Sequence, residues 1–265
     1  NKLQLSSNSL IQFLKILENK SYQKGFNEEN FIFSSHPVYK ERFEIINAIS
    51  NKQLYIVDQD LKKRFNFLKA KLFGFTEKNN NELDQYLKGD HYNYANSIIL
   101  SRKGKLKKSL IILNKLINKY PNNFFLLETK ADLLLAHGYA NEANKFYEIV
   151  FSKNKNNKYV KKRIFEIKYE QIDKKNKNTI ENFFDQFSNL MILFPNDVLL
   201  HEKFRNLANN VEKYDWIYFI DANLLIINKK NDMAIKIFND IIMNSKDKKL
   251  IKYSRKKIQL ISNIK

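Results

Sequence analysis

The side chains that most often do chemistry are sparse in this sequence, and their spacing does not group them. The histidines lie far apart, at His36, His91, His137 and His201. A zinc-peptidase helix needs H-E-x-x-H, but the residue four places after His201 is Arg205. Cysteine is absent, which excludes disulfides, thiol catalysis and cysteine-based zinc sites. Glycine-rich phosphate loops, G-x-S-x-G and calcium-loop patterns are also missing. The residues alone therefore encode no catalytic centre.

The charge balance points to an anionic partner only weakly. The formal net charge is +19, and such a charge suits nucleic acid or an anionic membrane surface. Lysine and asparagine are abundant along the whole chain, however, and lysines on outer helix faces are usually only solvated. Arginine is sparse and shows no pattern with aromatic residues. Nucleic acid is thus the less favoured partner, and peripheral membrane association stays open. The best apolar run, residues 217–227, is too short to span a bilayer and contains Asp221.

The elements that would position any binding residues are helices. Breakers are scarce, with 5 Gly and 3 Pro, which favours an all-α fold. Residues 93–157 contain the sequence pattern of a helical hairpin twice, with Gly104 and Gly138 at matching positions 34 residues apart. The same spacing relates Leu100 to Leu134, Ser109 to Ala143, and Leu113 to Tyr147. Helices are expected at 91–102, 106–119, 123–137 and 140–152, each pair joined at a glycine that can leave the first helix in a left-handed conformation.

This pattern resembles the tetratricopeptide repeat (TPR). The resemblance rests on the 34-residue period, on small residues at Ser97 and Ala131, and on Pro121 closing the first unit. A degenerate helix with a basic outer face is expected within residues 153–178, and "FPND" at 194–197 echoes "YPNN" at 120–123. A last copy is indicated by Ala222, Ala234 and Phe238. The final helix, 248–264, would close the stack.

The first helix of each TPR hairpin lines the binding face of the array, and aligning the copies on their glycines predicts which residues do so here. A polypeptide segment is the expected ligand of such a face. The predicted groove residues are Tyr94, Ile98, Ser101, Glu128, Asp132, Leu135, Trp216, Phe219 and Asn223. The alternative is that several of them, above all Leu135 and Trp216, belong to the hairpin core.

The first part of the chain is expected to form a separate domain, residues 1–78, ahead of a repeat domain at 79–265. Apolar stripes predict helices at 7–19, after Pro37, and at 58–73, with Gly74 as the end of the third. The order of these helices, "SSHPVYKERF" with His36, Pro37 and Arg42, and "KLFGF" ahead of TPR-like hairpins resembles bacterial zinc metallopeptidases of family forty-eight. The closer relatives are periplasmic and of the β-barrel assembly-enhancing type.

That resemblance implies a fold, a cofactor and a location. The chain would be the C-terminal part of an exported zinc metalloendopeptidase of envelope protein quality control, with repeats that bind substrate or a partner. The loop that carries His36 would lie near the zinc, where His36 could approach the metal or could equally be a structural residue of the loop with Pro37; Arg42 would hold that loop in place. The H-E-x-x-H motif and the glutamate ligand are not in this chain, so the chain would be inactive alone.

Two alternatives stay open. The chain could be a non-enzymatic TPR scaffold, which predicts a reading frame that begins near Asn1 with an initiator Met. It could also be a basic RNA- or DNA-binding repeat, which predicts affinity that falls steeply as salt rises.

Overall fold

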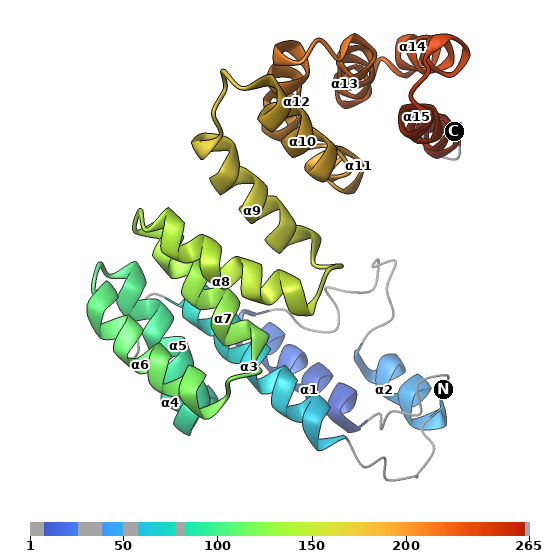
Figure 1. Cartoon of the computed structure of the whole chain (residues 1–265). Coiled ribbons are helices and arrows are strands. Elements are labelled where there is room, and N and C mark those ends of the chain that lie inside the picture. The colour runs from blue at the N-terminus through green and yellow to red at the C-terminus, as the bar shows by residue number, and fades with distance from the viewer. Residues whose placement is uncertain (1–7, 26–38, 50–57, 78–82, 263–265) are drawn as a thin grey trace. The chain divides into compact units, whose positions relative to one another are not determined.

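A computed structural model of the chain describes residues 8–25, 39–49, 58–77 and 83–262. Every regular element in these ranges is a helix (Figure 1), so the all-α prediction is confirmed there. The helices are α1 (Asn8–Gln23), α2 (Tyr39–Ile49), α3 (Gln59–Thr76), α4 (Leu83–Tyr86), α5 (Gly89–Arg102), α6 (Leu106–Lys119), α7 (Phe124–Ala136), α8 (Ala140–Lys153), α9 (Lys158–Gln171), α10 (Lys177–Phe187), α11 (Leu190–Leu193), α12 (Val198–Asn210), α13 (Tyr214–Ile227), α14 (Asn231–Asn244) and α15 (Lys248–Ser262).

The chain divides into two compact units, residues 1–66 and 67–265. The predicted boundary at 78/79 differs, because the second half of α3 belongs with the repeats. In the first unit, α1 and α2 contact each other, and Arg42 lies half-buried on α2. His36 and Pro37 lie outside the described residues, so their predicted roles stay predictions.

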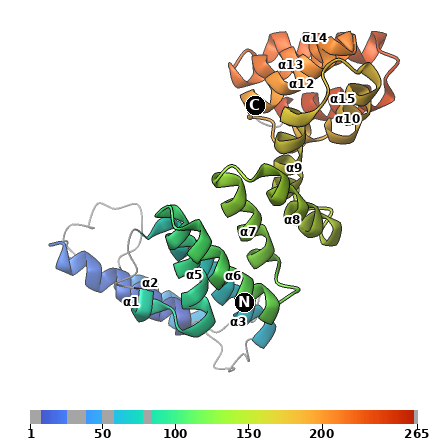
Figure 2. The same ribbon diagram turned by 60° about the vertical axis from the view of Figure 1, so that its left-hand side comes forward.

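Helices of the second unit pack in chain order, as the green-to-red progression of Figures 1 and 2 shows. The closest pairs are the hairpins α5–α6, α7–α8 and α13–α14. The small residues that recur at matching positions of the three hairpins are all fully buried: Ser97, Ser109, Ala131, Ala143, Ala222 and Ala234. The three copies aligned in the sequence therefore correspond to the three hairpins α5–α6, α7–α8 and α13–α14.

Four turns of this unit share one hydrogen-bonded geometry, in which the helix ends on a residue with positive φ. After α5, the N–H of Lys105 donates to the carbonyl of Leu100 at 2.9 Å across Gly104, whose φ is 76°. The same bond closes the turns that follow α7, α12 and α13, around Gly138 (φ 86°), Glu212 (φ 58°) and Lys229 (φ 61°). Two of the four turns thus hold a non-glycine residue in a conformation that favours glycine.

The predicted degenerate middle is ordered. Residues 158–171 form α9, and Phe165 on its inner face stacks on Phe204 of α12 with ring centroids 4.7 Å apart. The two "P-N" turns end alike, because Asn123 caps α7 by accepting from the N–H of Phe125 at 3.0 Å and Asp197 caps α12 by accepting from Leu200 at 3.1 Å.

Helices at both ends of the second unit lie across the hairpins. Gly74, predicted to end a helix, lies inside α3 instead, because α3 crosses α5 there. A Cβ at position 74 would stand 2.8 Å from the Cβ of Ile98 and 3.0 Å from the carbonyl oxygen of Ala95. At the other end α15 packs on α14 and α13. These two helices decide which part of the hairpin surface stays open.

Candidate functional site

Most of the predicted groove residues are core residues, and that part of the prediction is wrong. Six of the nine are at most 3% exposed: Tyr94, Ile98, Ser101, Trp216, Phe219 and Asn223. A side chain with no exposed surface cannot contact a bound peptide in this conformation. The physical reason differs between the two ends of the array.

At the first end, α3 covers the predicted face of α5. The ring of Phe67 on α3 lies 6.0 Å from that of Tyr94. The Tyr94 hydroxyl donates to the carbonyl of Phe125 at 2.9 Å and lies 2.6 Å from the hydroxyl of Thr129. Ser101 lies 3.0 Å from Nε2 of His137. These contacts join α3, α5 and α7 and bury the predicted face of α5.

At the second end, α15 and the turn before it cover α13. The indole N–H of Trp216 donates to Asp247 at 2.8 Å, and the ring of Tyr253 lies 6.1 Å from the Trp216 ring. The side-chain amide of Asn223 donates back to the carbonyl of Phe219 at 2.7 Å. The predicted residues of α13 therefore hold the last helices together.

On α7, the predicted residues do reach open space. Glu128 and Asp132 line a cleft of about 520 Å³ together with Tyr159 and Arg163 of α9 and Phe194. Both carboxylates face Nζ of Lys71 on α3, at 2.8 Å from Glu128 and 3.7 Å from Asp132.

The Asp132 carboxylate is perturbed by its surroundings. Burial raises the pKa of Asp132 above the ordinary aspartate value, although the hydrogen bond from the Tyr147 hydroxyl, at 2.6 Å, acts in the opposite direction. The desolvation of the charged form outweighs the bond. The structure thus holds a partly desolvated carboxylate at the edge of a cleft. Lys71, Tyr147 and Arg163 stabilise its charged form.

Leu135, the last predicted residue of α7, lines a second cleft of about 380 Å³ between α7, α9 and α12. Lys162 belongs to both clefts. Its ammonium group lies 3.6 Å from Glu166 and forms an ion pair with Asp197. One turn further, Lys203 pairs with Glu170 at 2.5 Å. We use the name α7–α9–α12 face for the surface formed by the two clefts and by the turn of α12 that carries Lys203.

Sequence reasoning missed the apolar part of this face. Residues 193–199 line a further hollow at its edge, where Leu199 is 71% exposed and Val198 is 39% exposed. Tyr159 is 66% exposed and its ring lies 5.5 Å from that of Phe194. The available signal was the "FPNDVLL" stretch, in which three aliphatic residues follow a helix cap and cannot all face the core.

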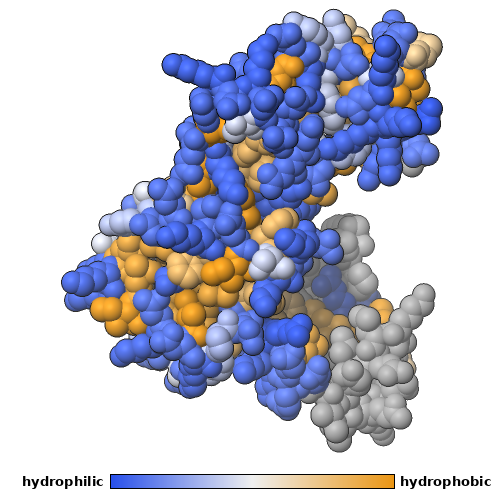
Figure 3. Space-filling model, viewed as in Figure 1, coloured by the Kyte–Doolittle hydropathy of each residue, from blue (hydrophilic) through white to orange (hydrophobic). Residues whose placement is uncertain are grey.

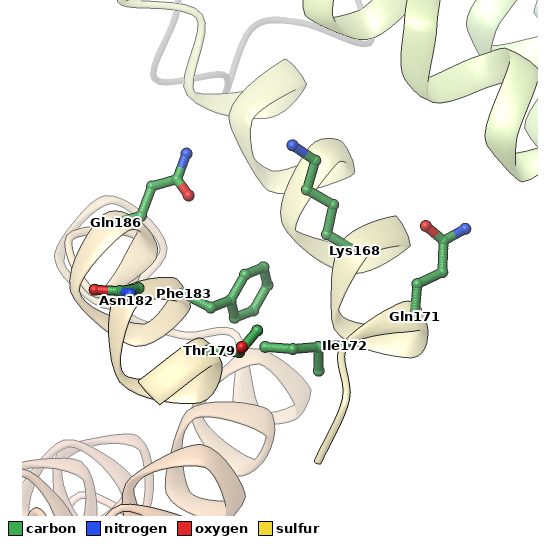
Figure 4. A pocket seen from close by; sticks show the side chains of 7 residues that line it. All are labelled: Lys168, Gln171, Ile172, Thr179, Asn182, Phe183 and Gln186. Carbon is green, nitrogen blue, oxygen red and sulfur yellow. The ribbon is translucent and has the colours of Figure 1, made fainter. Parts of the chain in front are cut away.

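Another notch lies on a different surface, between α9 and α10 (Figure 4). Its volume is about 410 Å³, and Phe183 and Ile172 project into the gap while Gln171 and Gln186 stand at the rim. Lys168, at the same rim, pairs with Glu148 at 2.7 Å. The notch contains few polar groups that converge on one point, so it is a weaker candidate than the α7–α9–α12 face.

The described residues include no group of three or more His, Asp or Glu side chains that could hold a metal ion. None of the described helices is long and apolar enough to span a membrane. Comparison of the sequence with protein-family models and with curated proteins gave no match.

Proposed function

We propose that the second unit is a protein-interaction module that binds a polypeptide segment on the α7–α9–α12 face. The observation that carries the proposal is the pair of adjoining clefts that share Lys162, edged by exposed Leu199 and Tyr159. Apolar anchors beside polar groups are the usual composition of a surface that recognises protein segments.

The charges of this face favour a polypeptide over nucleic acid. Lys162 and Lys203 are engaged with carboxylates of the same face, so their charge is largely neutralised before any ligand arrives. Lys158 lies 5.3 Å from the ring centroids of both Tyr159 and Phe194. A phosphate backbone requires cations that are free to replace counterions, whereas a peptide needs apolar contact and a few hydrogen bonds. Figure 3 shows hydrophobic residues emerging among the hydrophilic ones on the side of the unit that it displays.

A matched pair of variants tests the proposal. Leu199→Asp places a charge on the face, and Met243→Asp places the same charge at an equally exposed site on α14, since both residues are 71% exposed. The probe is a reduced and alkylated test protein that cannot fold, with binding measured by fluorescence anisotropy. We expect Leu199→Asp to weaken binding about tenfold or more and Met243→Asp to leave it unchanged. Equal effects of both variants, or affinity that falls steeply with salt in the wild type, would refute the proposal.

We further propose that this module works as the substrate- or partner-binding part of a zinc metallopeptidase of the cell envelope. The support is the resemblance of "SSHPVYKERF" and "KLFGF" to that family. The described residues do not fit a zinc site, so the proposal assigns them no catalytic step. Coding sequence upstream of Asn1 that contains H-E-x-x-H would support this proposal, and its absence from the gene would favour a non-enzymatic scaffold.

A further inference from the structure

Helix α3 presents a stripe of exposed apolar residues that its packing on α5 leaves uncovered among the described residues. The residues of the stripe are Leu61, Phe65, Leu68, Leu72 and Phe75. Their exposed fractions run from 40% at Phe75 to 61% at Phe65. The opposite face of the same helix is buried through Phe67, Ala70 and Gly74. Exposed aliphatic and aromatic residues are ordinary when single, but a contiguous row of them marks a contact surface.

The spacing of the stripe specifies what kind of surface would cover it. The intervals are four, three, four and three residues, which is the 3.5-residue repeat of a coiled-coil seam rather than the broader stripe of a helix that packs on a domain core. A row with this repeat stays in register with a second helix over its whole length. At 1.5 Å per residue the seam is about 21 Å long, or two heptads.

The charges beside the seam specify the chemistry of that second helix. The positions that flank a coiled-coil seam directly follow Leu61 and Leu68 and directly precede Phe65 and Leu72, and all four are basic: Lys62, Lys69, Arg64 and Lys71. Arg64 shares its charge with Asp60 at 2.7 Å, and Lys71 pairs with Glu128. Lys62 and Lys69 form no ion pair with a carboxylate in the described part of the chain. Flanking charges set partner choice in coiled coils.

We infer that α3 is a docking site for an amphipathic helix of a partner protein, with aliphatic residues at its seam and Glu or Asp at its flanks. A second copy of α3 fits poorly, because either orientation would bring lysine and arginine flanks together. Because the buried face of α3 packs against α5, α3 is already helical before a partner binds. Binding along a short seam therefore costs α3 little conformational entropy. This surface is distinct from the α7–α9–α12 face.

The test uses the full chain and two synthetic helical peptides of about three heptads, both with leucine at the seam. One carries Glu and the other Lys at the flanking positions. We expect the Glu peptide to bind about tenfold tighter or better. Lys62→Glu with Lys69→Glu should reverse that preference. Leu68→Ser with Leu72→Ser should weaken binding about tenfold, whereas Ile111→Ser, at a site of similar exposure on α6, should not.

Several results would overturn the inference. These are failure of the Glu peptide to bind, a preference that survives the double charge reversal, or equal weakening by Ile111→Ser. A wild-type dimer that Leu68→Ser with Leu72→Ser converts to monomer would assign the stripe to a second copy instead. Binding that appears only after Leu10→Ser with Phe13→Ser would assign it to α1 of the same chain. Leu199→Asp should leave peptide binding intact, which separates this test from that of the proposed function.

Discussion

Lys257 on α15 is a buried ammonium group whose removal should stabilise the protein. It is 6% exposed, and no carboxylate pairs with it in the described part of the chain. Burial lowers the pKa of Lys257 from 10.5 to about 8. The charge of Lys257 in turn acts, with burial, to lower the pKa of His201. The folded state therefore holds a cation away from water with little to compensate it.

The pKa difference gives the size of the effect. One pKa unit corresponds to about 1.4 kcal/mol, so the lowered pKa implies a cost of about 3 kcal/mol at neutral pH. Because the folded-state pKa lies below the unfolded one, the cost is fully present below about pH 8. It disappears as the pH rises towards 10.5, where the group is neutral in both states.

Lys257→Met keeps an aliphatic side chain at this position and removes the charge. We expect it to raise the free energy of unfolding by about 2–3 kcal/mol at pH 7 and the midpoint of thermal unfolding by about 5–10 °C. Urea unfolding followed by far-UV circular dichroism, at about pH 7 and about pH 10, measures both the gain and its decline. Lys256→Met is the control, because Lys256 is exposed on the same helix. A Lys257→Met variant that is no more stable than wild type, or whose gain is the same at both pH values, would refute the reasoning.

Three further predictions concern folding energetics. Lys229→Gly should raise the free energy of unfolding, measured with urea, by about 1 kcal/mol, because Lys229 has a φ of 61°, a conformation that is costly for any residue except glycine. An unchanged urea midpoint would contradict this prediction. Gly74→Ala should destabilise by about 1–3 kcal/mol, since the new Cβ would meet Ile98 at 2.8 Å and this outweighs the better helix propensity of alanine; a more stable variant would be the opposite result. Burial lowers the pKa of His201, so stability should fall as the pH drops below about 6.5; His201→Gln should lose part of this dependence, and an identical pH profile would contradict the assignment.

The local elements of this protein follow from the sequence. The predicted helix at 106–119 agrees with α6, and the helices predicted at 123–137 and 140–152 differ from α7 and α8 by one residue at most at each end. The 34-residue period placed Gly104 and Gly138 at positions of positive φ. These features depend on interactions within one hairpin, where periodicity and turn residues are sufficient guides.

Exposure was decided by tertiary packing. Tyr94 and Glu128 occupy the same position in successive copies, yet Tyr94 is buried and Glu128 reaches a cleft. The difference comes from α3, which lies across α5 and stops short of covering all of α7. In the same way α15 buries Phe219 on α13. A repeat pattern states which residues share a face of a hairpin, but it cannot state which copies a helix from elsewhere in the chain will cover, because that depends on contacts between distant segments.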